Sequence, residues 1–305
     1  MPTQIPSRQW FILRDLAKNL LMFLIPNTIH RIRGSTGTGN RQLDRDIPAL
    51  VVYAQKVFQN YCRYLTQAGA SIDFKDKTIL ELGPGDTMAT AFIFIAHGAR
   101  RVMCFDRFNL ISNVKKNSLA AKTILSGLPQ NQRVELLSEL TFDGRGRLGV
   151  HGDRLCCIFN KSEKINLPDC SVDIIVSNAV LEHVRNLDKL FADMYRILKP
   201  GGMMVHAVDL KSHDPHAINP LDFLTLPDGL WKWLTCYRGA PNRKRKSYYD
   251  MLLKRCGFQL KTCKITNIFC DDDCQDFIRK NPGRGKAYTI EDLSCGGFIF
   301  AAQKP

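Results

Sequence analysis

Beyond residue 75, short β-type runs alternate with helical stretches, and this alternation constrains the fold more than any other feature of the chain. Such an order is typical of a parallel sheet with helices on both faces. The sequence therefore predicts an α/β fold with a doubly wound sheet. The predicted strands are residues 78–82, 101–105, 155–159, 173–177 and 203–208.

A glycine-rich turn follows the first predicted strand. It reads ELGPGD at residues 81–86, and a predicted helix comes next at residues 87–96. Doubly wound sheets bind ligands at the carboxyl ends of their strands, because glycines let the backbone approach and a helix N-terminus offers unpaired N–H groups. The second strand ends at Asp106, which lies 21 positions after Gly85. An acidic residue at about this spacing is placed to accept hydrogen bonds from the ribose of an adenosine-containing cofactor.

The strand, turn, helix and acidic residue together predict a nucleoside cofactor. A nicotinamide or flavin dinucleotide is disfavoured, because Met88 occupies the position of the third glycine in the dinucleotide fingerprint. Another glycine-rich segment, at residues 34–40, lacks the Gly-Lys-Ser/Thr ending of a phosphate-binding P-loop. We interpret that segment as a linker.

Residues 1–70 are predicted to form a helical extension. An amphipathic helix is expected at residues 10–25, where the polar side chains fall on one face, and a second helix at about residues 48–67, where apolar side chains repeat on one face. The first helix is shorter than the roughly 20 residues that span a hydrocarbon core. It therefore either lies in a membrane interface or covers the pocket of the main domain.

The net charge and the cysteine content of the chain indicate which binding partners and which cellular compartment are expected for the protein. The composition, 45% hydrophobic and 24% charged, excludes collagen-like and disordered chains. The formal net charge of +14 favours encounters with a phosphorylated substrate, nucleic acid or an anionic membrane surface, without choosing among them. Eleven scattered cysteines are typical of free thiols in a reducing compartment. We expect a cytoplasmic protein, peripheral to a membrane if residues 10–25 meet lipid.

Several segments, taken in order, resemble the successive motifs of class I S-adenosylmethionine-dependent methyltransferases, in the branch that methylates small molecules and glycans. The likeness is good over about residues 70–210 and weaker from there to the end of the chain. The segments are ELGPGD (81–86), Asp106, LPDCSVDIIVSNAVLEHV (167–184), LKPGG (198–202), YYDMLLKRCGF (248–258) and GFIFAAQKP (297–305).

The resemblance implies a Rossmann-like methyltransferase fold, with a seven-stranded, mostly parallel sheet whose last strand is antiparallel. The methyltransferase domain would span residues 71–305, with an acceptor-side insert at about residues 210–255. The implied cofactor is S-adenosyl-L-methionine, and the implied activity is methyl transfer.

Position by position, the resemblance implies a set of cofactor-binding residues. Glu81, Gly83 and Gly85 would shape the loop around the methionine end of the cofactor. Asp106 would hold the ribose, and Asn178 would line the floor beside the sulfonium.

The adenine contact departs from the family pattern. The family often has an acidic residue after the third strand to meet the adenine amine, and that position here is Lys161. Glu163, two residues on, or a backbone group is expected to replace it.

Methyl transfer from a sulfonium is an in-line displacement, so alignment of the reactants supplies most of the rate. A hydroxyl acceptor must also lose its proton, and histidine is the usual base near neutral pH. The candidate catalytic residues are His183, Asp209 and His213. Strand alternation makes Asp209 a better pocket residue than His206.

No metal site is expected. Relatives that methylate quinol precursors hold a divalent ion with a glutamate at each end of a Glu-Val-Leu-Glu-His segment, but Ala179 replaces the first glutamate here. The cysteines at positions 270 and 274 are too widely spaced for a zinc knuckle.

The acceptor is expected to be a small molecule or a glycan. Aromatic side chains beside a run of cations in the insert suit a sugar or nucleotide-linked acceptor with phosphate; the alternative is a surface charge run with buried tryptophans. Other hypotheses are methylation of RNA or protein, and a non-catalytic module that binds S-adenosylmethionine. Nucleic acid is not expected, because no zinc ribbon or RRM motif is present. The insert residues concerned are Trp231, Trp233, Tyr237, Arg238, Arg243, Lys244, Arg245 and Lys246.

Overall fold

The fold is described from a computed structural model. The described residues are 17, 20, 45–109, 111, 114–150, 152–160, 162–213, 217, 219–235 and 240–305. The helix predicted at residues 10–25, apart from residues 17 and 20, and the linker predicted at residues 34–40 lie outside this part of the chain. Binding of that helix to a membrane stays a prediction. Within the described part, no helix has the length and apolar character needed to cross a bilayer.

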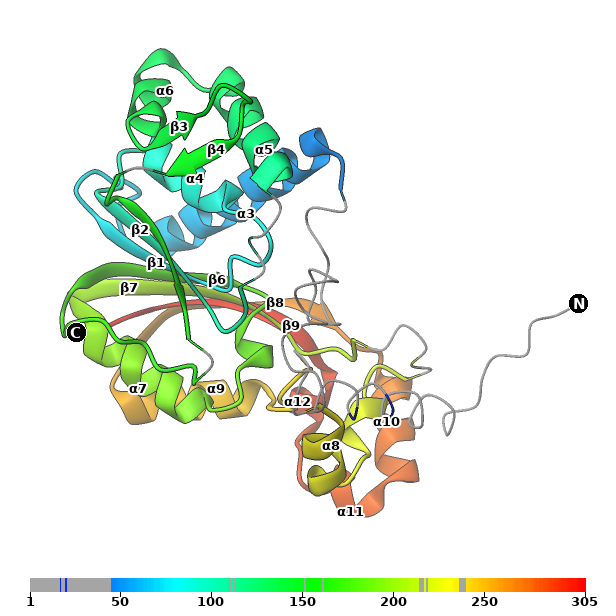
Figure 1. The fold of residues 1–305 in the computed structure, drawn as a ribbon. Coiled ribbons are helices and arrows are strands. Elements are labelled where there is room, and N and C mark those ends of the chain that lie inside the picture. The colour runs from blue at the N-terminus through cyan, green and yellow to red at the C-terminus, as the bar shows by residue number, and fades with distance from the viewer. Residues whose placement is uncertain are drawn as a thin grey trace, which may run out of the picture.

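A seven-stranded sheet forms the centre of the molecule, in the spatial order β5-β2-β1-β6-β7-β9-β8 (Figure 1). Neighbouring strands from β5 to β7 are parallel, whereas β9 is antiparallel to both β7 and β8. This confirms the predicted fold class and the antiparallel last strand. The strands are β1 (Thr78–Leu82), β2 (Arg101–Asp106), β5 (Leu155–Phe159), β6 (Val172–Asn178), β7 (Leu198–Asp209), β8 (Gln259–Ile268) and β9 (Cys295–Gln303).

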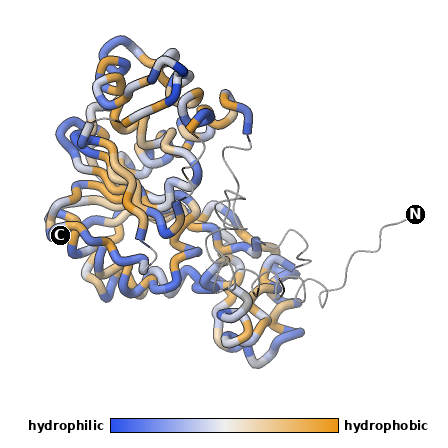
Figure 2. The backbone as a smooth tube through the Cα atoms, viewed as in Figure 1, coloured by the Kyte–Doolittle hydropathy of each residue, from blue (hydrophilic) through white to orange (hydrophobic). Residues whose placement is uncertain are grey.

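Helices cover both faces of the sheet, as the near-continuous apolar strands require. One face carries three helices whose apolar side chains share a core with Ile79 and Val176, and the other face carries two helices that share a core with Leu80 and Ile175. Figure 2 shows the strands as the most hydrophobic part of the backbone. The first group is α3 (Ile47–Gln67), α4 (Ala89–Ala96) and α5 (Val114–Gly127); the second is α7 (Leu187–Ile197) and α9 (Lys246–Cys256).

Helix α3 is the second helix of the predicted extension. It begins where Asp46 caps the helix by accepting a hydrogen bond from the N–H of Ala49 at 2.8 Å, and Pro48 occupies the first turn. Its predicted apolar face, which includes Leu50, Phe58 and Leu65, is buried. The prediction of this helix is therefore confirmed, and the structure packs it onto the sheet domain.

Two further groups of elements flank the sheet. A short hairpin of β3 (Leu140–Phe142) and β4 (Leu148–Val150) lies with α6 (Gln130–Leu137) beside α5. A small helical group has its own apolar cluster around Leu221, Phe269 and Phe277 (Figure 1). Its elements are η3 (Asp222–Leu224), α8 (Asp228–Thr235), α10 (Asp271–Lys280), α11 (Pro282–Gly285) and α12 (Ile290–Ser294). The insert predicted at about residues 210–255 thus shares its core with residues after β8.

Candidate active site

The glycine turn after β1 depends on the absence of side chains at two positions. Gly83 and Gly85 have φ angles of 63° and 74°, in the left-handed region that favours glycine. A Cβ on Gly83 would lie 2.4 Å from Cγ2 of Val180, whereas a Cβ on Gly85 would meet nothing within 4 Å. Gly83 therefore permits close packing of β1 against the segment after β6, and Gly85 presents bare backbone to open space.

Asp106 ends β2 beside this turn. Gly83 donates its N–H to the carbonyl of Phe105 at 2.8 Å, and Asp106 accepts a hydrogen bond from the N–H of Phe108 at 2.9 Å. Burial raises the pKa of Asp106 to about 6, while the N–H groups of Phe108, Arg107 and Gly85 act to lower it. The carboxyl ends of β1 and β2 are therefore adjacent, and the carboxylate of Asp106 faces the backbone of the glycine turn.

Glu81 lies beneath the turn rather than in it. It is 5% exposed, and Cys104 donates to its carboxylate through Sγ at 3.7 Å. Burial raises the pKa of Glu81 to about 7. The carboxylate faces the sheet side covered by α3, where it also raises the pKa of Tyr61.

Asn178, at the end of β6, contacts Tyr53, a residue that no sequence pattern had pointed to. Its Nδ2 donates to the hydroxyl of Tyr53 on α3 at 2.9 Å, and the guanidinium of Arg45 lies 5.0 Å from the centre of the Tyr53 ring. Helix α3 therefore forms one wall at the edge of the sheet where the predicted cofactor residues gather.

Glu163 is engaged by neighbours on both sides. Its carboxylate pairs with Arg107 at 3.6 Å and accepts a hydrogen bond from the N–H of Arg185 at 3.1 Å. The pairing with Arg107 places it beside the tip of β2, at the end of the site predicted for adenine. Lys161, the residue at the family's acidic position, lies outside the described part of the chain.

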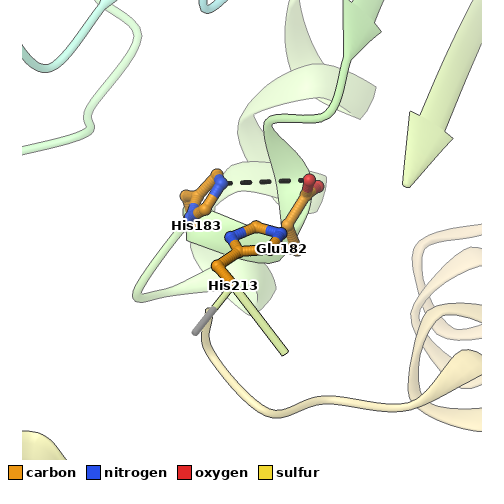
Figure 3. Close-up of side chains that lie close together, drawn as sticks. All are labelled: Glu182, His183 and His213. Carbon is orange, nitrogen blue, oxygen red and sulfur yellow. Dashed lines mark ion pairs between the residues drawn. The ribbon is translucent and has the colours of Figure 1, made fainter. Parts of the chain in front are cut away.

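A second group of side chains gathers where β6 and β7 end. His183 and Glu182 belong to the short 3-10 helix η2 (Leu181–His183), and His213 lies in the loop after β7. The rings of His183 and His213 are 4.9 Å apart (Figure 3), and Nε2 of His213 is 3.7 Å from Oδ2 of Asp209. The structure thus brings together the three predicted catalytic residues and adds Glu182 to them.

Glu182 is the functional candidate that the sequence prediction missed. It is 1% exposed, and neither of its carboxylate oxygens has a hydrogen-bond partner among the described residues. Burial raises the pKa of Glu182 well above its ordinary value and the nearby charge of Asp209 adds to this, while the backbone N–H groups of Glu182 and Asp209 act to lower it. Asn242 fixes η2 from the insert, donating its backbone N–H to the carbonyl of Glu182 and its side-chain amide to the carbonyls of Leu181 and Val184.

His206 lies on β7 and was disfavoured as a pocket residue by strand alternation. In the structure it is a core residue. It is fully buried, and Nδ1 of its ring lies 2.7 Å from the hydroxyl of Ser177. Burial lowers the pKa of His206 to about 3, so its ring is neutral near pH 7. Asp209, on the opposite face of the strand end, is the residue that meets the histidine group.

Two described cations of the insert, Arg243 and Arg245, are buried and bound within the protein. Arg245 is 2% exposed and donates to the carbonyls of Leu210, Asp292, Leu293 and Cys295. Arg243 is 9% exposed and binds Asp228 and the carbonyls of Phe223 and Leu226. Of the two alternatives for the insert, binding of an acceptor phosphate does not hold for the guanidinium groups of Arg243 and Arg245, because both hold segments of the chain together.

The remaining insert residues are only partly available to a ligand. Lys246 pairs with Asp250 at 2.7 Å, and Lys244 lies over the ring of Tyr248. Nε1 of Trp231 donates to the carbonyl of Pro241 at 3.0 Å, whereas Trp233 is 53% exposed. Tyr237 and Arg238 lie outside the described residues.

The sequence of the chain matches a family model described as a methyltransferase domain over residues 53–262, which is more than half of the chain. The chain belongs to this methyltransferase family. The methyltransferase uses S-adenosylmethionine as its cofactor, as the resemblance of its motifs implied.

Solved structures similar to the methyltransferase include three of different kinds. One is an S-adenosylmethionine-dependent methyltransferase from Mesorhizobium loti, with 16% identity, a TM-score of 0.44, and coverage of 81% of this chain and 99% of the other. Another is the [4+2]-cyclase SpnF, with 15% identity, a TM-score of 0.45, and coverage of 100% and 98%. A third is phosphoethanolamine N-methyltransferase 2 of Haemonchus contortus, solved with phosphomonomethylethanolamine and S-adenosylhomocysteine, with 16% identity, a TM-score of 0.44, and coverage of 81% and 52%.

The turn of the methyltransferase has the features that a nucleoside cofactor needs. Open space lies over Gly85, and the carboxylate of Asp106 lies beside it, able to accept hydrogen bonds from two ribose hydroxyls. The residues present therefore fit the cofactor. We propose that Glu81, Gly83, Gly85, Asp106, Glu163 and Asn178 form its binding site.

A matched pair of glycine substitutions tests the role of Gly85. Gly85→Ala and Gly69→Ala both place a side chain at a φ near +75° with nothing within 4 Å, so each should destabilise the fold by about 1–2 kcal/mol. Only Gly85→Ala puts a methyl group into the predicted cofactor space. We expect it to weaken S-adenosylmethionine binding by at least about tenfold, by calorimetric titration, while Gly69→Ala binds normally. Equal affinities would contradict this assignment.

Proposed function

We propose that the methyltransferase transfers a methyl group to a hydroxyl of a small-molecule or glycan acceptor. The observation that carries the proposal is the group of His183, Asp209 and His213, which lies at the ends of the strands next to the glycine turn. Bound S-adenosylmethionine supplies an electrophilic methyl group on its sulfonium. A hydroxyl is a weak nucleophile at neutral pH, so its oxygen needs residues that draw off its proton.

His183, Asp209 and His213 are the catalytic residues of this proposal. They come from η2 and from the end of β7 and the loop after it. Val180, just before η2, contacts the glycine turn, so the group stands beside the predicted cofactor site. An acceptor oxygen held there would attack the methyl carbon as the carbon–sulfur bond breaks, and its proton would pass to this polar group.

One feature favours a small molecule or glycan over a macromolecule. The buried positions of Arg243 and Arg245 remove two cations from the basic run that the sequence offered to an anionic partner. The +14 charge still permits contact with RNA. The test is to incubate the full chain and tritiated S-adenosylmethionine with separated cell fractions.

The proposal expects label in the small-molecule or glycan fraction, held in a methyl ether. Label confined to RNA or protein would overturn it in favour of macromolecular methylation. Absence of transfer to every fraction, with cofactor binding intact, would favour a non-catalytic binding module. A His213→Asn variant should lose at least about 100-fold in rate while its affinity for S-adenosylmethionine is unchanged, because His213 is placed on the acceptor side.

A further inference from the structure

We propose that Glu182, His183 and His213 bind a divalent transition-metal ion, for which zinc is the best match. One ligand atom from each of the three residues lies within 4.8 Å of the others (Figure 3). Two imidazole nitrogens and one carboxylate oxygen are a ligand set that zinc uses in catalytic sites, where a further position stays open. The sequence excluded a metal site with a glutamate at position 179, because this chain has alanine there. The site proposed here takes its third ligand, His213, from the loop after β7 instead.

The first argument is the state of Glu182. A carboxyl group that is 1% exposed and has no hydrogen-bond partner among the described residues is costly in either protonation state, because buried polar groups are normally hydrogen-bonded and buried charges are normally paired or coordinate metals. The imidazole of His183 lies beside it, with its Nε2 3.9 Å from Oε1. A metal ion between the three side chains would supply the partner that this carboxylate lacks.

The second argument is the position of Asp209. Nε2 of His213 lies 3.7 Å from Oδ2 of Asp209, and Nδ1 of the same ring has no hydrogen-bond partner within the described part of the chain. Metal-binding histidines usually donate their other ring N–H to a carboxylate, which fixes the ring and its tautomer. His213 is therefore arranged to bind through Nδ1 while Asp209 orients it.

The third argument is convergence. Ligands about 2.1 Å from a tetrahedral zinc ion lie about 3.4 Å apart, so ligand atoms that are now within 4.8 Å of one another need to close by about 1.4 Å or less. The backbone that carries Glu182 and His183 is fixed, since Asn242 donates to the carbonyls of Leu181, Glu182 and Val184. Rotation of the side chains is enough to complete the site.

The role of the ion rests on the proposed function. With the ion bound, a hydroxyl at the open position would be more acidic; its proton would be released to water instead of to the imidazoles, which the ion occupies, and its oxygen would attack the sulfonium methyl group. The carbon–sulfur electrons stay on sulfur, giving S-adenosylhomocysteine and a methyl ether. In this arrangement the two imidazoles hold the ion, and the ion activates the acceptor.

Metal binding is tested without any acceptor. The metal-free full chain is titrated with Zn²⁺ against a chromogenic chelator, alongside Glu182→Gln, His213→Gln and a control, His97→Gln. His97 ends α4 and bonds the carbonyl of Ile93, far along the chain from this group. We expect one tight site in the wild type and in the control, and a loss of at least about 100-fold in affinity in the other two variants.

Replacing Zn²⁺ with Co²⁺ distinguishes metal binding at this site from metal binding to the cysteines of the chain. Nitrogen and oxygen ligands give visible bands without the intense near-ultraviolet charge transfer that thiolates produce, and this is the spectrum we expect. No tight Zn²⁺ site, a thiolate spectrum, or equal affinity in all variants that melt like the wild type would overturn the inference. Metal binding without methyl transfer to a hydroxyl would leave the site standing and overturn the proposed function instead.

Discussion

The Arg245→Ala variant should lose about 3 kcal/mol of unfolding free energy. Arg245 is 2% exposed and donates to four carbonyl oxygens. These belong to the residue after β7, to α12 and to the start of β9, so one guanidinium joins three segments. Alanine leaves the carbonyls without their charged donor, and each such hydrogen bond contributes about 1.5–3 kcal/mol.

Thermal unfolding followed by circular dichroism measures this effect. For a domain of this size, the loss corresponds to a melting temperature lower by roughly 6–12 °C. Lys244→Ala is the matched control, since Lys244 is the exposed neighbour that lies over the ring of Tyr248, and we expect it to change stability by less than about 1 kcal/mol. An Arg245→Ala variant that melts like the wild type but binds its acceptor weakly would restore the anion-binding interpretation of this residue.

The Asp106→Ala variant should have the largest effect on cofactor binding. Asp106 is held beside the turn by the N–H of Phe108, and the N–H of Gly85 also lies close enough to its carboxylate to lower its pKa against the effect of burial. Two hydrogen bonds from ribose hydroxyls to a carboxylate are expected to contribute about 2–4 kcal/mol, which corresponds to roughly 30-fold to 1000-fold in affinity. Asp106→Asn keeps one acceptor oxygen, so its affinity for S-adenosylmethionine should lie between that of the wild type and that of Asp106→Ala.

A control variant shows whether Asp106→Ala weakens cofactor binding through the lost hydrogen bonds or through the change in net charge. Asp169 carries its carboxylate on the surface, 73% exposed and paired with Arg196. Asp169→Asn removes one negative charge from the same domain without touching the strand tips. Its affinity for S-adenosylmethionine should equal that of the wild type, and a loss comparable to that of Asp106→Ala would mean that net charge governs the binding.

Local patterns predicted the fold and the turn because the responsible interactions are local. The apolar runs of β1, β2 and β5 match the observed strands to within one residue, and the φ angles of Gly83 and Gly85 explain why glycine stands there. Strand β7 begins earlier than expected because Leu198 already pairs with Val172. The C-terminal helical group was not foreseen, since its core joins residues on both sides of β8.

The contents of the active site were harder to predict, because they depend on contacts between distant segments. Glu182 and His213 meet only after β6 and β7 pair, so no spacing in the sequence reveals them as neighbours. Tyr53 reaches Asn178 across 125 positions. Arg243 and Arg245 look like part of a surface charge run, and only the structure reveals that carbonyl oxygens surround them.

Calorimetric titration of the full-length wild type and Asp106→Ala with S-adenosylmethionine tests the central claim most directly. The account predicts one cofactor molecule bound per wild-type chain, and binding at least about 30-fold weaker in the variant at an unchanged melting temperature. A wild-type chain that binds no cofactor, or a variant that binds as tightly as the wild type, would contradict the assignment of the β1 and β2 tips as the cofactor site.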